Sequence, residues 1–254
     1  MHIERIGFTP LKGARHLTHH LVDLSADGPV GDRVFCLVDP SHGRVLRTVQ
    51  NPTLLQACAR WQAGVLSVEL QGRTFEGVPS PSGQIFNVDY WGRAAAVQSC
   101  AGPWADAYSE FLGYDVVLAR SATAGEVVYG ASVTLVTTAS IRLLHQRLGR
   151  EVDSARFRST FLVDAGSCTS HVEDSWVGRE LRVGSATVRV RAVVPRCAVV
   201  DLDPATGRND APVLGELAGY RQNQGQREIG FGVDAAVTAS GRVRAGDQVV
   251  LNST

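Results

Sequence analysis

The chain has 254 residues, 44% hydrophobic and 20% charged, so it can bury a sizeable core and is not expected to be disordered. Its 25 basic and 25 acidic residues balance, which argues against a nucleic-acid binder or a polybasic membrane binder. No apolar run reaches the roughly 18 residues of a spanning helix, and residues 1–12 lack the apolar stretch of a signal peptide. We therefore expect a cytoplasmic protein without a membrane span.

The first half of the chain is predicted to form mostly short strands. The segment DRVFCLVD at residues 32–39 is followed by a Pro-Ser-His-Gly turn, a pattern typical of a strand. Residues 77–83, rich in Gly, Pro and Ser, are expected to form a loop. Further strands are predicted over residues 64–70, 84–88 and 94–99.

Three helices are predicted. Residues 103–112 begin with proline in the first turn and are followed by Gly113. Residues 137–148 carry apolar side chains at helical spacing, and Gly149 follows as a C-cap. A third, shorter helix is expected over residues 210–218, with a proline near its start.

Strands resume in the second half of the chain. They are predicted over residues 158–164, 180–183, 186–194 and 198–202, and the last segment, residues 242–251, contains Gly246-Asp247 before an apolar strand. Many short strands with few helices indicate a mainly β protein built from barrels or curled sheets.

Five cysteines without a Cys-x-x-Cys pair argue against a disulfide framework, a structural zinc site or an iron–sulfur cluster. Cys36 and Cys58 are predicted to be core residues. Cys197 is predicted to lie at a strand corner beside Arg196, where a cation would favour a reactive thiolate. The alternative for Cys197 is a small buried hydrophobe.

Two further segments have a functional and a structural interpretation. Arg156 and Arg158 lie two residues apart and would share one face of an extended chain, where they could clamp an anion. The alternative is a solvated strand edge. Residues 173–176, Glu-Asp-Ser-Trp, are predicted to form a structural turn anchored by a buried Trp176.

Four segments of the second half together resemble the MOSC domain, a family named for the C-terminal part of molybdenum-cofactor sulfurase. They read RFRSTFLVD, EDSWVGREL, RCAVVDLDPATG and GDQVVL, at residues 156–164, 173–181, 196–207 and 246–251. The first half resembles the family's N-terminal β-barrel module through Pro10-Leu11-Lys12, GDRVFCLVD at 31–39 and Gln50-Asn51-Pro52. The resemblance implies a β-barrel-like module over residues 1–100 and a MOSC-type β-barrel over residues 101–254.

The resemblance to members of the amidoxime-reducing type implies a molybdenum cofactor with Cys197 as its metal ligand and catalytic residue. The residues implied to bind the cofactor are Lys12, Arg33, Arg47, Gln50, Arg156, Arg158, Thr160 and Arg196. The sequence departs from the family pattern at two places. Ser159-Thr160 replaces a Pro-Asn pair, and Val49 stands where arginine is usual. Thr160 and Arg47 are the residues expected to compensate.

Three functions follow as hypotheses. The first is a molybdenum-cofactor reductase that takes oxygen from N-hydroxylated small molecules and receives electrons from a separate donor protein. The second is a sulfur carrier in which Cys197 bears a persulfide. The third is a non-catalytic protein or one that binds pyridoxal phosphate, with which Lys12, the chain's single lysine, could form a Schiff base.

Overall fold

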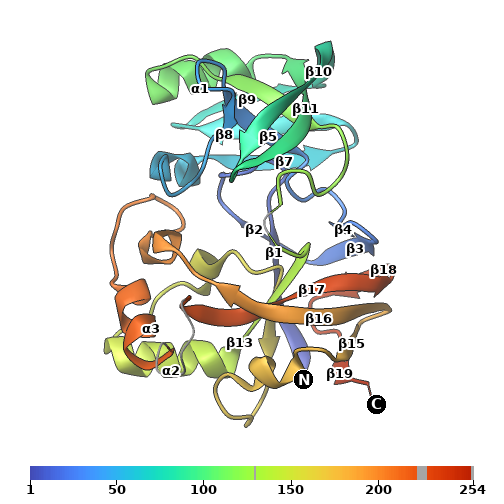
Figure 1. The fold of residues 1–254 in the computed structure, drawn as a ribbon, viewed down its shortest axis with the longest axis vertical. Helices are drawn as coiled ribbons and strands as arrows, with labels where there is room; N and C mark the ends of the chain where they lie inside the picture. The colour runs from blue at the N-terminus through green and yellow to red at the C-terminus, as the bar shows by residue number, and fades with distance from the viewer. Residues whose placement is uncertain (129, 222–227, 253–254) are drawn as a thin grey trace.

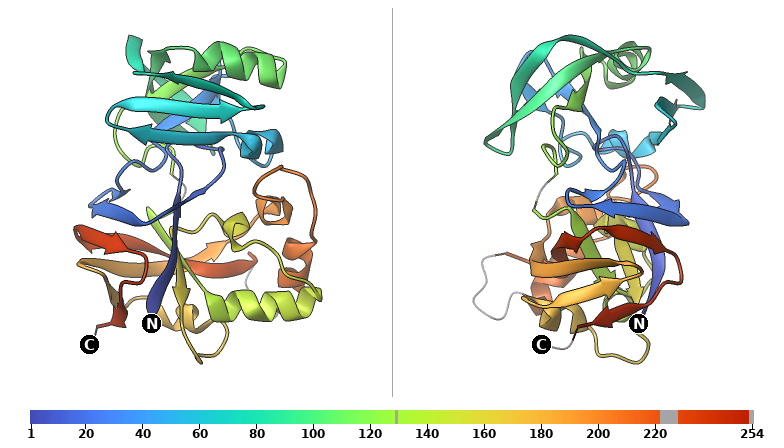
Figure 2. Two further views of the ribbon diagram at one scale, coloured as in Figure 1. Left: turned by 180° about the vertical axis from the view of Figure 1, so that it is seen from behind. Right: turned by 90° about the vertical axis from the view of Figure 1, so that its right-hand side faces the viewer.

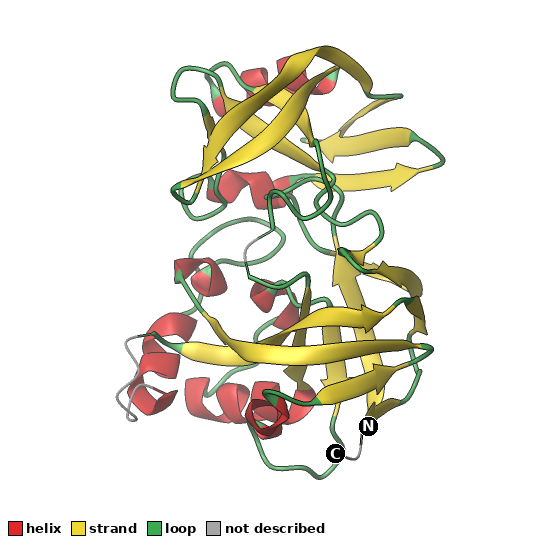
Figure 3. Cartoon of the chain, turned by 45° about the vertical axis from the view of Figure 1, so that its right-hand side comes forward, coloured by secondary structure: helices red, strands yellow, loops and turns green. Residues whose placement is uncertain are grey.

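The computed structural model describes residues 1–128, 130–221 and 228–252. Strands dominate, and they form two modules stacked along the long axis (Figure 1). The prediction of a mainly β protein with a few helices is confirmed. Mostly loops occupy the region between the modules (Figure 3).

The upper module is built around a closed barrel with strand order β10-β11-β12-β5-β6. Its strands are β5 (Phe35–Asp39), β6 (Arg44–Val45), β10 (Ser80–Tyr90), β11 (Arg93–Ala101) and β12 (Val117–Ser121). A three-stranded sheet and one helix pack beside the barrel: β7 (Cys58–Gln62), β8 (Val65–Leu70), β9 (Arg73–Gly77) and α1 (Trp104–Leu112). Trp104 and Tyr108 bury the inner face of α1 in the core shared with these strands.

The lower module contains an eight-stranded sheet with the order β19-β15-β16-β17-β13-β14-β1-β2. Its members are β1 (His2–Phe8), β2 (Leu17–His19), β13 (Val133–Thr137), β14 (Phe161–Asp164), β15 (Glu180–Val183), β16 (Ala186–Pro195), β17 (Gly230–Ala239) and β19 (Val249–Leu251). Helices α2 (Thr138–Leu148) and α3 (Val213–Arg221) lie to one side of this sheet (Figure 2). The core contains Trp176, which is 1% exposed at the predicted structural turn.

The first strands of the chain belong to the lower module. Strand β1 pairs antiparallel with β14, so that Ile6 lies opposite Phe161. A separate sheet joins β3 (Leu21–Ser25) and β4 (Gly28–Pro29) to β18 (Gly241–Arg244) near the C-terminus. Between β1 and β2, residues 10–15 already reach the upper module, where Leu11 bridges to Phe35. After β4 the chain enters the upper module again and leaves it after β12. The lower module thus combines strands from both ends of the chain.

Local signals in the sequence identify two helices well. Helix α1 ends at Gly113, whose φ of 78° is the left-handed conformation that glycine adopts without strain. The Thr137 side chain caps α2 by accepting a hydrogen bond from the Ser140 N–H, and Gly149 ends the helix in the same left-handed conformation. Helix α3 begins three residues later than predicted, at Val213.

Two strand predictions and one loop prediction need correction. Residues 198–202 do not form a strand, because Ala198–Asp201 closes into a 3-10 helix, η4. Strand β14 begins at Phe161, since the 3-10 helix η2 (Ser154–Phe157) precedes it. The predicted loop over residues 77–83 is partly strand, because β10 begins at Ser80 and pairs with β11 from there.

The two cysteines predicted to lie in the core differ in burial. Cys36 is fully buried in the barrel, as predicted. Cys58 is only partly buried, because it starts β7 and the neighbouring Ala59 points into the core instead. Successive side chains of a strand face opposite sides, so only one of the two can do so.

Candidate active site

A cavity of about 490 Å³ lies between the two modules and has walls from both. The upper module contributes Lys12 and Arg33, and the lower module contributes Arg158 and Cys197. Six lining residues are Lys or Arg, whereas Glu228 is the one acidic residue among the described lining residues. The cavity is therefore strongly basic, although the net charge of the whole chain is zero. Such a concentration of positive charge attracts an anionic ligand.

The Cys197 side chain is exposed and lines this cavity. Cys197 lies in the turn between β16, which ends at Pro195, and the 3-10 helix η4. Proline cannot donate to the strand ladder, so pairing ends there. Cys197 is extended, and its carbonyl oxygen accepts a hydrogen bond of 3.1 Å from the Val200 N–H. The corner predicted around Cys197 is thus present, and it turns the thiol toward the cavity.

Arg196 holds this turn from the inside. Its Nε donates to the Phe231 carbonyl oxygen at 2.8 Å, and its Nη1 donates to that of Phe157 at 2.9 Å. Burial lowers the pKa of Arg196 to about 10, so the guanidinium stays charged at neutral pH. Its buried Nη2 has no hydrogen-bond partner in the described part of the chain. Since a buried N–H without an acceptor is costly, this atom is available to a ligand.

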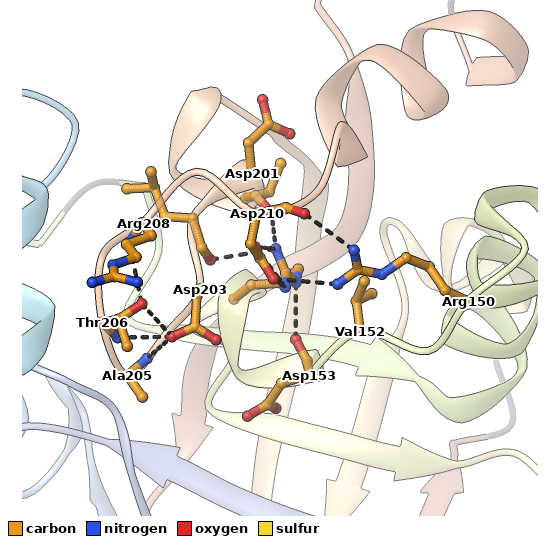
Figure 4. Close-up of polar contacts among 12 residues, drawn as sticks. Arg150, Val152, Asp153, Asp201, Asp203, Ala205, Thr206, Arg208 and Asp210 are labelled. Atoms are coloured by element: carbon orange, nitrogen blue, oxygen red, sulfur yellow. Dashed lines mark hydrogen bonds and ion pairs between the residues drawn. The ribbon is translucent and has the colours of Figure 1, made fainter.

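Arg156 stabilises the segment that follows Cys197. Its guanidinium donates to the carbonyl oxygens of Val200 at 2.9 Å and Leu202 at 3.3 Å, and it pairs with Asp210 at 3.3 Å. A further bond of 3.2 Å runs to the carbonyl oxygen of Asp153. Figure 4 shows Asp153 and Asp210 on opposite sides of this contact network. Although Arg156 lines the cavity, its charge is already compensated from within the protein.

The Asp203–Gly207 loop connects the same segment to the upper module. The Asp203 carboxylate accepts hydrogen bonds from the backbone and hydroxyl of Thr206, at 2.7 and 2.8 Å, which closes the loop (Figure 4). Arg15 of the upper module donates to the Ala205 carbonyl oxygen at 2.6 Å. Gly207, with φ 73°, leaves no room for a Cβ, which would lie 2.0 Å from the Pro52 carbonyl oxygen. The segment after Cys197 is therefore held by both modules.

Arg158 differs from Arg156 although it is only two residues away. The two do not share one face of an extended chain, because Arg156 lies within the 3-10 helix η2 and Arg158, which follows it, is left-handed, with φ 51°. The Arg158 guanidinium lines the cavity and makes no hydrogen bond or ion pair with any residue that the structure describes. Burial, together with the nearby Arg33, lowers its pKa to about 9. Arg158 is a charged donor without a partner in the cavity wall.

Lys12 lies beside these cations. Its backbone N–H donates to the Phe35 carbonyl oxygen at 2.8 Å, and its Nζ donates to the Tyr90 hydroxyl at 2.8 Å. Burial lowers the pKa of Lys12 to about 7, with further contributions from Arg33 and Arg158. An anion in the cavity would relieve the repulsion and favour the protonated amine.

Arg33 and Arg47 also line the cavity, but both have carboxylate partners. Arg33 forms an ion pair with Asp32, and its Nη2 lies 3.3 Å from Nε2 of His16. Burial, with repulsion from nearby arginines, lowers the pKa of His16 well below its usual value, so the ring is neutral. Arg47 pairs with Asp89 at 3.1 Å. These contacts hold both guanidinium groups in the wall.

Gln50 and Thr160, both predicted to bind the cofactor, are not among the described cavity-lining residues. Gln50 is exposed elsewhere. Thr160 is 3% exposed, and its hydroxyl accepts a hydrogen bond of 3.1 Å from the Thr134 N–H, so it is occupied within the sheet. The geometry therefore does not support the expectation that Thr160 replaces the missing family residue in cofactor binding. Arg47, the other residue expected to compensate, does line the cavity.

Sequence reasoning missed two aromatic residues of the wall. Tyr90 and Trp91 line the cavity at the turn between β10 and β11. The sequence indicated only a turn there, and no pattern within the strand shows that it closes against Lys12. Their contact is long-range, across 78 residues in the case of Lys12 and Tyr90.

Comparison with known families identifies the chain. The MOSC domain model matches residues 121–250, and the model of the MOSC N-terminal beta barrel domain matches residues 1–115. The chain therefore belongs to the MOSC domain family.

The curated relatives include proteins named mitochondrial amidoxime reducing component 2. The human protein is 32% identical over 122 residues, which cover 45% of this chain and 35% of the human chain. The rat protein is 26% identical over 255 residues, which cover 87% of this chain and 73% of the rat chain. The match thus spans only about a third of the length of the human relative.

Solved structures are similar at low identity. The YUAD protein from Bacillus subtilis gives a TM-score of 0.47 at 12% identity, covering 100% of this chain and 96% of that one. YiiM from Geobacillus stearothermophilus gives 0.36 at 16% identity, covering 48% and 54%. Among the described residues, no helix has the length and apolar character needed to cross a membrane.

Proposed function

We propose that this protein is a molybdenum-cofactor-dependent reductase that removes the hydroxyl oxygen of an N-hydroxylated small molecule. The observation that carries the proposal is one cavity in which the exposed thiol of Cys197 accompanies Lys12 and Arg158, two cations without a carboxylate partner in the described chain. Membership of the MOSC family and relatives named amidoxime reducing component support it.

The residues present fit the cofactor chemically. A cysteine thiolate is a soft ligand of the kind that a molybdenum–sulfur centre takes. Lys12, Arg33 and Arg158 would balance the charge of the cofactor's phosphate, and the buried Nη2 of Arg196 lacks an acceptor among the described residues. When bound, the cofactor supplies the redox chemistry, while the chain binds and orients.

The chain's own residues have distinct tasks in this proposal. Cys197 would ligate the metal, and Arg156 with Asp210 keeps the segment after Cys197 in place. The overall reaction consumes two electrons and two protons: R–NH–OH + 2 e⁻ + 2 H⁺ gives R–NH₂ + H₂O. We expect the electrons to come from a separate donor protein, and we expect the reaction to take place in the cytoplasm, as the sequence predicts.

Metal content tests the proposal directly. The protein would be expressed in a host that makes molybdenum cofactor, as wild type, Cys197→Ser and Cys168→Ser. Cys168 is the matched control because it is also an exposed free cysteine but does not line the cavity. We expect near-stoichiometric molybdenum in the wild type and Cys168→Ser, and its loss in Cys197→Ser with an unchanged melting temperature. Absence of molybdenum from all three proteins would contradict the proposal.

A sulfur carrier is the second candidate, favoured by the exposure of Cys197 beside the buried cation of Arg196. It predicts a mass increase of one sulfur atom on Cys197 in protein that contains no molybdenum. Pyridoxal phosphate is a third candidate, since burial and neighbouring arginines lower the pKa of Lys12, as a Schiff base requires. Its signature would be a visible absorption band that is lost in Lys12→Ala.

A further inference from the structure

A second cavity, of about 450 Å³, lies beside the main cavity that contains Cys197. Arg33, Val128 and Ser132 line both cavities, so the two share part of one wall, but Cys197 is not among the described residues of the second. We propose that the second cavity binds a small monocarboxylate with an apolar body, which Arg120 anchors by its charge. This site lies outside the proposed reductase chemistry and does not depend on it.

Both connections between the two modules form part of the wall of the second cavity. The connection from β4 to β5 contributes residues 30–34, and the connection that starts at the end of β12 contributes residues 121–125. The Ser121 N–H donates a hydrogen bond of 3.0 Å to the Val34 carbonyl oxygen. This bond holds the two connections together along the cavity, so a ligand there would contact both.

Arg120 is a cation of the second cavity without a carboxylate partner in the described part of the chain. Its guanidinium carbon lies 5.4 Å from the centroid of the Trp61 ring, and both residues line the cavity. The Trp61 ring is held in turn by an edge contact with the buried Phe35 ring, at 5.6 Å between centroids. A guanidinium placed over an aromatic ring can still use its N–H groups as a fork. That fork matches the two oxygens of a carboxylate.

The other charges of the wall favour a ligand with a single negative charge. The described lining residues include two arginines and two aspartates. Arg33 pairs with Asp32, and Asp27 is exposed on the turn between β3 and β4. The second cavity is thus close to neutral before a ligand binds, whereas the main cavity is strongly basic. A dianion such as phosphate is therefore expected in the main cavity and a monoanion in the second.

Ser121, which follows Arg120 in the sequence, offers a second polar contact. Its residue lines the cavity, and its Oγ is buried without a hydrogen-bond partner among the described residues. A buried hydroxyl that lacks a partner costs free energy. A carboxylate oxygen that accepts a hydrogen bond from this hydroxyl would remove that cost.

Apolar side chains provide the remainder of the site. Val30 and Ile85 line the cavity and are 56% and 59% exposed, and Val34 and Pro81 also belong to its wall. An apolar body that covers these side chains gains the free energy of removing them from water. A concave site with an apolar wall and a few polar groups is typical of small-molecule binding.

Isothermal titration calorimetry with octanoate tests the inference. We expect saturable binding by the wild type, and an affinity lower by at least about tenfold in Arg120→Gln, because a charged hydrogen-bonding partner is lost. Octanol, which has the chain without the charge, should bind the wild type more weakly than octanoate by a similar factor. Arg60→Gln is the matched control, since Arg60 is an exposed arginine beside Trp61 that does not line the cavity. It should bind octanoate like the wild type.

A second pair of variants tests the apolar wall and does not rely on Arg120→Gln. Ile85→Asn should lower the affinity for octanoate about fivefold. Val78→Asn is its control, because Val78 is a 68% exposed apolar residue of the same module outside the cavity. It should leave the affinity unchanged.

The alternative location for a carboxylate is the main cavity, and Arg158→Gln distinguishes the two. We expect Arg158→Gln to keep octanoate binding, because Arg158 lines only the main cavity among the described contacts. Loss of binding in Arg158→Gln with retention in Arg120→Gln would overturn the inference. So would the absence of saturable octanoate binding, or octanol binding as tightly as octanoate. Molybdenum content does not enter these titrations, so the reductase proposal can fail without affecting the result.

Discussion

Replacing Arg156 by alanine is expected to destabilise the fold, whereas replacing Arg158 by alanine is expected to spare the fold and release the bound anion. The Arg156 side chain is 1% exposed and bonds two carbonyl oxygens of the segment after Cys197 as well as Asp210. Arg158 has no such partner among the described residues and lies near two other cations, Arg33 and Lys12.

The magnitude follows from these contacts. Removing one member of a buried ion pair costs about 3–5 kcal/mol. Because the Asp210 side chain is 30% exposed and can be rehydrated, we expect the lower end for Arg156→Ala, about 3 kcal/mol. For a chain of this size that lowers Tm by roughly 6–12 °C. Arg158→Ala removes a buried cation that its neighbour Arg33 repels, and breaks no side-chain hydrogen bond within the described chain, so it should not lower the free energy of unfolding.

Urea unfolding of cofactor-free protein measures the first quantity, and molybdenum content measured well below Tm gives the second. Arg150→Ala is the control, because Arg150 pairs with the same Asp210 at 3.4 Å from a half-exposed position. Its cost should be under about 1 kcal/mol. Equal destabilisation by Arg156→Ala and Arg158→Ala, or full molybdenum content in Arg158→Ala, would show that the structural distinction between the two arginines is wrong.

Three further predictions concern other parts of the molecule. Because the pKa of Lys12 falls to about 7 in the folded protein, the unfolded state binds more protons above that pH. The stability of anion-free protein should therefore rise from pH 7 toward 10, and Lys12→Met should flatten this part of a urea-unfolding profile. Gly207→Ala places a Cβ against the Pro52 carbonyl and should cost about 1–3 kcal/mol on thermal or urea unfolding; an unchanged free energy would mean that the loop docks loosely. A thiol reagent should label Cys197 within minutes and spare Cys36, which is fully buried and whose pKa is raised to about 12; mass spectrometry reports the order.

Local patterns were sufficient for some elements and insufficient for others. Helix α2 follows from apolar spacing and a glycine after its last turn, both of which are local. Within the predicted strand over residues 198–202, Ala198–Asp201 forms a 3-10 helix instead. The Arg156 guanidinium donates hydrogen bonds to the carbonyl oxygens of both Val200 and Leu202, which favours this compact conformation over an extended one. Nothing within those five residues signals this long-range contact.

By itself, the sequence determined the mainly β composition, two of the three helices and the corner that presents Cys197, because strand alternation, caps and turn residues act over a few neighbours. Only the tertiary structure decided which cations face the cavity. In the sequence, Arg156 and Arg158 are the same residue type two positions apart. In the structure, Arg156 pairs with Asp210, whereas Arg158 adopts a left-handed backbone conformation. Likewise, Trp91 and Cys197 are far apart in sequence, and they line one cavity only because the cavity has walls from both modules.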